Sequence, residues 1–118
     1  MQEDIEVFSR DELICIMHID NANKQITITN FVEPEGMYLY FLPFGKNKNP
    51  TWENYKHFLS KRTFSPGRAD AKVLLKGLKI DRYDPDAIVR KTHGVMNDDF
   101  VWLRYPGEKI EFKDVRVR

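Results

Sequence analysis

Two apolar segments joined by a short polar turn constrain this fold more than any other feature of the sequence. Residues 13–19 are rich in β-branched side chains, and residues 24–31 alternate between polar and apolar positions. The four residues between them, Asp-Asn-Ala-Asn, include side chains that tolerate tight turns. Alternation with a period of two is typical of a strand with one buried face, so these segments predict a β-hairpin.

Further strands are expected on both sides of this hairpin. Residues 5–8 predict a short strand before it, and residues 37–42 predict a third strand after it. Near the end of the chain, residues 100–105 predict another strand and Pro106-Gly107 fits a type II turn. Residues 110–112 are then expected to return as the second half of a C-terminal hairpin.

Three helices are expected in the middle of the chain. Thr51 can cap the first, and Ser65 and Asp84, each followed by a proline, can cap the second and third. Because strands and helices are segregated along the chain, we predict an α+β fold, with a small antiparallel sheet packed against a three-helix segment. We expect Trp102 to be buried against the first of these helices.

Size and composition limit the class of protein. With 118 residues, 42% of them hydrophobic, the chain is expected to form a single domain over residues 1–118 with a real core. The single cysteine, Cys15, cannot form an internal disulfide, and the N-terminus does not resemble a signal peptide. We therefore expect a cytoplasmic protein. The longest apolar run, residues 37–44, is too short to span a bilayer.

Charge is distributed unevenly along the sequence. Residues 1–45 carry eight acidic and two basic side chains, whereas residues 46–82 carry ten Lys or Arg against three acidic side chains. Residues 83–118 carry seven of each sign, and the whole chain has a formal net charge of +1. Such a dipolar distribution steers partners, so the basic middle of the chain is the leading candidate for a binding surface.

Patterns that would indicate catalysis or ligand binding are weak. Cys15 and His18 are an odd number of positions apart in a predicted strand and should point to opposite faces, which disfavours a shared metal. His93 with Asp98 and Asp99 is a minor candidate for an acid–base cluster, but no nucleophile signature accompanies it. The six glycines do not cluster as a phosphate-binding loop requires. We expect no catalytic residue, metal or cofactor.

The basic stretch predicts a partner-binding surface made of Lys56, Lys61, Arg62, Phe64 and Arg68. A large apolar residue between two guanidinium groups, as Phe64 is between Arg62 and Arg68, is an anchor that interfaces favour. Alternatively, Phe64 folds into the joint between two helices. An acidic protein surface is the expected partner. Cations interleaved with aromatic residues in 46–82 also suit a nucleic-acid-binding accessory protein, which is the second interpretation.

Several short motifs keep a fixed order along the chain. Residues 38–45 have the sequence YLYFLPFG, residues 62–68 have RTFSPGR, residues 94–103 contain Gly94, Asp99 and Trp102, and residues 113–115 are KDV. In this order they resemble the N-terminal region of bacterial HipA-type toxin kinases. That family has a Tyr-Leu-Pro segment, an Arg-Ser-x-Pro-x-x-Arg joint, a Gly-Leu-Ser-Leu-x-Asp-x-Tyr-Trp-Ile segment and a closing Glu-Asp-Val. The proline of the joint is displaced by one position here.

The resemblance covers the chain from Leu13 onward and implies a stand-alone regulatory module, because a HipA-type kinase continues into a kinase body that this chain does not include. Such a module packs on a kinase or is supplied separately as an antitoxin-like subunit. We therefore expect a non-enzymatic interaction module of a toxin–antitoxin or mobile-element system that binds and restrains a kinase-like protein. A phage or mobile-element inhibitor of a host protein is a further alternative.

Overall fold

Four strands form one antiparallel sheet in the order β3-β2-β1-β4. The computed structural model describes residues 2–96 and 99–115. The strands are β1 (Gln2–Ser9), β2 (Glu12–Asp20), β3 (Gln25–Asn30) and β4 (Val101–Arg104). The helices are α1 (Tyr38–Phe41), α2 (Trp52–Lys61), α3 (Ala71–Gly77), α4 (Pro85–Thr92) and α5 (Phe112–Val115). The predicted α+β class is confirmed.

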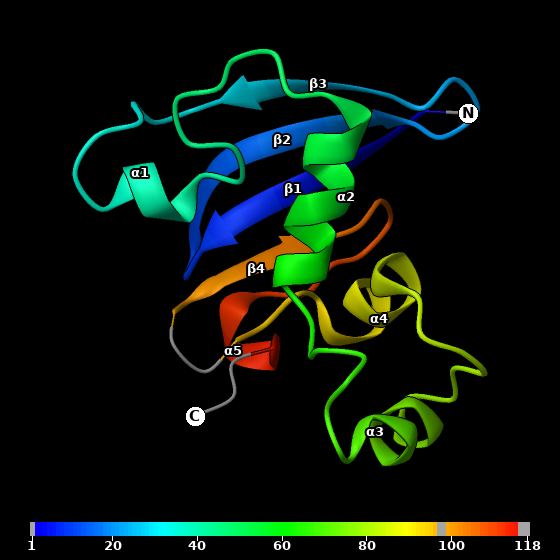
Figure 1. Ribbon diagram of the computed structural model, residues 1–118. Helices are drawn as coiled ribbons and strands as arrows, with labels where there is room; N and C mark the ends of the chain where they lie inside the picture. The colour runs from blue at the N-terminus through cyan, green and yellow to red at the C-terminus, as the bar shows by residue number, and fades with distance from the viewer. Residues whose placement is uncertain (1, 97–98, 116–118) are drawn as a thin grey trace.

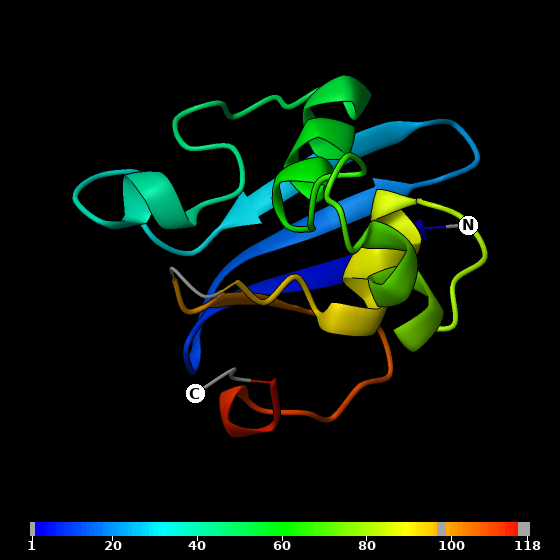
Figure 2. The same ribbon diagram turned by 60° about the horizontal axis from the view of Figure 1, so that its bottom comes forward.

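The helices lie on both faces of the sheet. In Figure 1, α2 crosses the front of the sheet, with α1 to one side and α4 and α3 to the other. The turned view in Figure 2 places α5 on the opposite face, below β1 and β4. Among the described residues, no helix is long and apolar enough to cross a membrane.

The expected hairpin is β2 paired with β3, in a register that places Met17 opposite Ile28. The Asp20 carboxylate closes the turn, because it accepts hydrogen bonds from the backbone N–H and the side-chain amide of Asn23 at 3.1 and 2.8 Å. Lys24 completes the turn with a φ of 52°. The short strand expected at residues 5–8 is also confirmed, and it is longer than predicted.

The core lies between the sheet and α2. Alternate strand residues point towards this helix, as a period of two requires. They meet a helical face whose members are spaced three and four residues apart. The fully or almost fully buried members from these elements are Ile5, Val7, Cys15, Met17, Ile19, Tyr55, Phe58, Leu59, Val101 and Leu103.

The third strand predicted at residues 37–42 is wrong, because this segment forms the short helix α1. Backbone hydrogen bonds run from Phe41 to Met37 and from Leu42 to Tyr38 at 3.2 and 3.0 Å. Only Leu42 is buried, while Tyr40 is 79% exposed. A short apolar run suits a strand or a helix equally well by its pattern, and here the segment lies outside the sheet, where no neighbouring strand pairs with it.

The strand predicted at residues 110–112 is also wrong. Gly107 makes the expected turn with a φ of +85°, but the chain then forms α5 instead of pairing with β4. The outer edge of β4 is already occupied, since the Leu103 N–H donates to the His93 carbonyl at 2.8 Å. A returning strand would compete for those backbone groups.

Two of the three predicted helix starts are confirmed. Thr51 caps α2 and Asp84 caps α4, with Pro85 as the first residue of that helix. Ser65 instead begins a turn, in which the Arg68 N–H donates to the Ser65 carbonyl at 3.1 Å, and α3 starts only after Asp70. Gly67 follows Pro66 directly, and the low helix propensity of glycine opposes a helix at that point.

Trp102 is buried as predicted, with 1% of its surface exposed, but its neighbours differ from the prediction. Its ring stacks on Phe8 with centroids 4.7 Å apart, and its indole N–H donates to the Arg10 carbonyl at 2.7 Å. Val101 and Leu103 face the α2 core, so the alternation of β4 directs Trp102 to the other face of the sheet.

Candidate functional site

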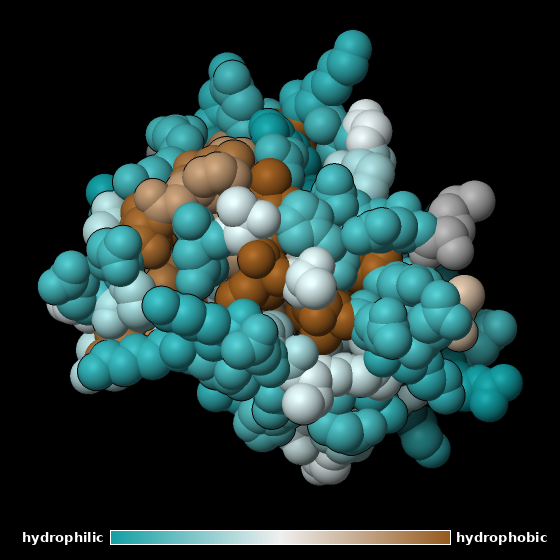
Figure 3. Space-filling view, turned by 90° about the horizontal axis from the view of Figure 1, so that it is seen from above, coloured by the Kyte–Doolittle hydropathy of each residue, from teal (hydrophilic) through white to brown (hydrophobic). Residues whose placement is uncertain are grey.

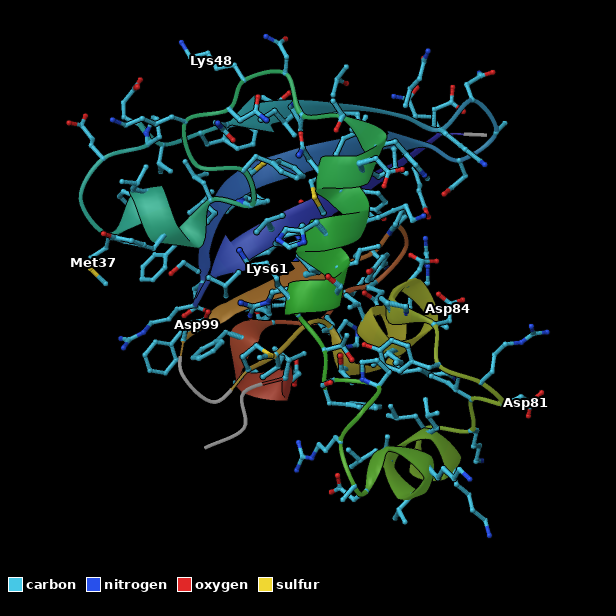
Figure 4. The ribbon with its side chains drawn as sticks, in the orientation of Figure 1. Met37, Lys48, Lys61, Asp81, Asp84 and Asp99 are labelled. Atoms are coloured by element: carbon cyan, nitrogen blue, oxygen red, sulfur yellow. The ribbon has the colours of Figure 1, made fainter. Side chains whose placement is uncertain are left out.

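A groove lies between α1 and α2 and has a volume of about 560 Å³. Its apolar floor includes Leu42, Phe44 and Phe58. Figure 4 shows Lys61 and Asp99 on the side of α2 that faces α1. The groove therefore combines an apolar floor with charged groups at one end, a combination typical of binding sites.

The α2 wall of the groove is set by how this helix begins. The Thr51 hydroxyl accepts a hydrogen bond from the Asn54 N–H at 3.1 Å, and the Asn54 side chain accepts one from the Thr51 N–H at 2.9 Å. This capping box fixes the rotation of the helix. Because Tyr55, Phe58 and Leu59 face the core, the residues beside that face, Asn54, His57 and Lys61, line the groove.

The α1 side of the groove exposes one large apolar side chain, Tyr40, which lines the groove and is 79% exposed. Met37, the residue before α1, is 64% exposed and lies on the side of α1 away from α2 (Figure 4). The helix is held in place by Tyr38, whose hydroxyl donates to the Glu12 carboxylate at 2.6 Å, and by Leu42, which is buried. Exposed apolar side chains beside a groove are characteristic of protein interaction sites.

Arg62 closes one end of the groove and makes four hydrogen bonds inside the protein. Two go to the Asp99 carboxylate at 2.8 and 3.0 Å, and one each goes to the carbonyl groups of Gly94 and Val101 at 2.9 and 2.8 Å. Only 11% of the Arg62 side chain is exposed. The guanidinium therefore ties α2 to the segment before β4.

The Asp99 carboxylate is ionised by its surroundings. Burial is the largest single effect and opposes ionisation, but the hydrogen bonds and charge of Arg62 and the Val101 N–H together outweigh it. The pKa of Asp99 consequently lies below its ordinary value of 3.8. A charged, bidentate pair of this kind is stronger than neutral hydrogen bonds.

A left-handed corner brings the Gly94 carbonyl to Arg62. His93 and Gly94 have φ values of 60° and 67°, a conformation that glycine adopts without strain. His93 Nε2 lies 2.7 Å from the Glu108 carboxylate, within hydrogen-bond distance. The candidate cluster of His93 and Asp99 is therefore not assembled, since each faces a different partner; Asp98 lies outside the described residues.

The five predicted partner-binding residues are brought together only in part: Arg62, Phe64 and Arg68 line one hollow of about 380 Å³, whereas Lys56 and Lys61 do not line it. Lys61 lines the groove, and Arg62 is held internally beside it. Lys56 is exposed elsewhere on α2, because five residues correspond to about 140° around a helix. Phe64 is half-buried with its ring centroid 5.8 Å from that of Tyr83, and exposed Arg68 pairs with Asp70. The alternative that Phe64 folds into the helix joint describes its position best.

The other basic residues of 46–82 are spread over the molecule. Figure 4 shows Lys48, near the start of this stretch, at one end of the structure, and Asp81, near the end of the stretch and beside α3, at the other. Lys46 and Lys48 line a small hollow next to β3, together with Ile28 and Val32. Figure 3, which looks onto the side of β3, shows hydrophobic side chains gathered in the middle of this face within a hydrophilic rim. In the described part of the chain, Lys46 and Lys48 thus line one hollow beside β3 and Lys72, Lys76 and Lys79 line another beside α3, so these cations do not share one hollow as a nucleic-acid groove would require.

A hydrogen-bonded row of three polar side chains was not predicted. His18 Nδ1 lies 2.8 Å from the Asp4 carboxylate, and its Nε2 lies 2.8 Å from the Thr29 hydroxyl. The three residues come from adjacent strands and lie side by side on the face away from α2, with Asp4 and Thr29 exposed. The row resembles an Asp-His-Thr relay, but it lies outside the groove, and such a relay needs oxyanion donors to act in catalysis.

Some of the motif residues noted in the sequence meet at the groove, whereas Trp102 and residues 113–115 do not line it. Residues 39–45 line it, and Arg62, Gly94 and Asp99 hydrogen-bond at its end although up to 37 positions separate them. Comparisons with known protein families, curated proteins and solved structures find no match to this chain.

Sequence reasoning missed the groove because it assigned α1 to the sheet. Once residues 37–42 are treated as a strand, Tyr40 becomes a sheet residue rather than an exposed side chain on the groove rim. The available signal was Gly36 before the segment and Pro43 after it, which isolate a short aromatic stretch from the strands.

Proposed function

We propose that this protein is a non-enzymatic interaction module of a toxin–antitoxin or mobile-element system, and that it binds and restrains a kinase-like partner. The observation that carries the proposal is the groove between α1 and α2, with its apolar floor, Lys61 at one end, and exposed Tyr40 on its rim. Large apolar side chains next to a pocket are the usual energetic centre of a protein interface.

The resemblance to HipA-type kinases supplies the class of partner. Residues 39–45 of its first motif line the groove, and Arg62, Gly94 and Asp99 from its other motifs form the cluster that closes it. A shared structural role for motif residues that are distant in sequence supports treating the resemblance as meaningful. The acidic surface of a kinase-like protein would complement Lys61.

Binding to a HipA-type kinase, measured by biolayer interferometry, tests this proposal. Tyr40→Ala and Lys61→Glu should each weaken binding by about tenfold or more, because both side chains are exposed at the groove. Lys56→Glu is the matched control, since it makes the same charge change elsewhere on α2. If Lys56→Glu weakens binding as much as Lys61→Glu, the groove is not the interface.

Restraint of the kinase requires a separate measurement. Autophosphorylation of the kinase should fall when wild-type protein is added, and Tyr40→Ala should restore it. If the wild-type protein binds without changing autophosphorylation, the proposed regulatory role is wrong. If it does not bind at all, the kinase-like partner is wrong.

A further inference from the structure

Helix α3 is the least covered helix of more than one turn in the described structure. Figure 1 shows it at the lower end of the molecule, with β3 at the upper end. Ala71 is its only buried residue, and Val73 is 71% exposed. Leu74 and Leu75 are only half-buried. Leucines of a helix in a folded domain normally lie against a neighbour, so α3 has apolar surface that the described chain leaves uncovered.

The end of α3 folds an additional aliphatic side chain onto this surface. Lys79 adopts a left-handed φ of 61°, and the Ile80 N–H then donates to the Leu75 carbonyl at 2.9 Å. This arrangement is a Schellman-type helix end, which commonly brings a hydrophobic residue back onto the last turn. Leu75 and Ile80 thereby become the apolar lining of a hollow of about 480 Å³.

Three lysines surround that hollow. Lys72 and Lys76 are one helical turn apart, and Lys79 follows at the helix end. The lining contains one carboxylate, Asp81, and no ion pair joins these lysines to any acidic residue that the structure describes. Like charges held one turn apart repel each other, so a negatively charged group entering the hollow would relieve that repulsion.

We propose that the α3 hollow, defined by Lys72, Leu75, Lys76, Lys79 and Ile80, binds an acidic amphipathic segment of a partner protein. An aliphatic side chain of the segment would lie between Leu75 and Ile80, and its carboxylates would pair with the lysines. The surface is separate from the α1–α2 groove, since none of its residues lines that groove, and it does not depend on the identity of a kinase partner.

The chemistry of the hollow favours a protein segment over nucleic acid. Proteins that hold single strands combine cations with aromatic side chains on which bases stack. The residues that line this hollow are aliphatic or charged, and none is aromatic. Aliphatic side chains within a cationic rim instead match leucine and glutamate side chains on one face of a peptide.

Fluorescence anisotropy with a labelled acidic peptide tests the proposal on the full chain. The probe is a peptide of about 16 residues in which leucines recur every three or four positions among glutamates. We expect saturable binding that Lys76→Glu with Lys79→Glu weakens by about tenfold or more.

Two matched controls decide between site-specific and general charge binding. Lys46→Glu with Lys48→Glu makes the same charge change near β3 and should weaken binding less than about twofold. A peptide with serine in place of every leucine should bind about tenfold more weakly than the probe. Four results would each overturn the proposal. The two pairs of charge reversals could weaken binding equally, or the serine peptide could bind as tightly as the probe. A single-stranded DNA of equal charge could bind more tightly than the probe, or the probe could show no saturable binding.

Discussion

Replacing Arg62 by alanine removes four hydrogen bonds and leaves the Asp99 carboxylate without its cation. Removing one partner of a fully buried ion pair costs about 3–5 kcal/mol. The exposed fractions of the two side chains are 11% and 25%, so water offsets part of this loss. Two carbonyl groups also lose their donors. We expect Arg62→Ala to lower the free energy of unfolding by about 2–4 kcal/mol.

Urea denaturation followed by tryptophan fluorescence measures this change, since Trp102 is buried. The control is Arg68→Ala, which removes a surface ion pair and should change stability by less than about 1 kcal/mol. A double-mutant cycle with Asp99→Asn isolates the pair itself. If Arg62→Ala and Arg68→Ala lower the free energy of unfolding by equally small amounts, Arg62 does not stabilise the fold. Arg62 is then again a candidate partner-binding residue.

The ion pair between Arg62 and Asp99 also makes the free energy of unfolding depend on pH, in a direction that the lowered pKa of Asp99 determines. Because the pKa of Asp99 is lowered in the folded protein, its stabilisation is present above its ordinary value of 3.8 and is lost as the pH falls through the lowered pKa. The stability difference between wild type and Asp99→Asn should therefore shrink below about pH 4. A difference that stays constant down to pH 2 would contradict the ion pair.

Three further experiments test other parts of the fold. Burial raises the pKa of Cys15 to about 12, so iodoacetamide at pH 8 should modify this thiol only when the protein unfolds. Labelling of Cys15 in native buffer as fast as in urea would contradict this. Trp102→Ala should lower the free energy of unfolding by about 3–5 kcal/mol in a urea titration, and a loss below about 1 kcal/mol would exclude the stacked, buried ring. Thr51→Ala should cost about 1 kcal/mol by thermal denaturation, whereas Thr51→Ser, which keeps the capping oxygen, should cost much less.

Local signals in the sequence were sufficient for most elements of this fold. The β2–β3 hairpin follows from alternation around a turn, and the starts of α2 and α4 follow from Thr51 and Asp84. Each of these patterns depends on neighbours within a few residues. The face of β4 towards which Trp102 points depends instead on the register of β4 against β1, which no local pattern contains.

The candidate site was less predictable, because its parts come together only in three dimensions. Arg62 looked like a free cation beside Phe64, and no feature near it indicates that Asp99 and the carbonyl groups of Gly94 and Val101 will surround it. The motif resemblance did select Arg62, Gly94 and Asp99, yet it gave them no common role. The strand prediction for residues 37–42 failed because burial decides between strand and helix for a short apolar run. Six residues alone do not show which of their side chains will be buried.

The contacts around β4 also limit how this sheet can grow. The outward-facing backbone of β4 is engaged at three points: the Leu103 N–H by His93, the Val101 N–H by Asp99, and the Val101 carbonyl by Arg62. Within the described chain, no strand pairs with the outer edge of β3, the other end of the sheet. Fibre growth by strand addition needs two open edges per molecule, whereas one open edge ends in a dimer. The His93 contact and the Arg62 cluster therefore block strand addition at the β4 edge, so that growth of the described sheet by strand pairing is limited to the β3 edge.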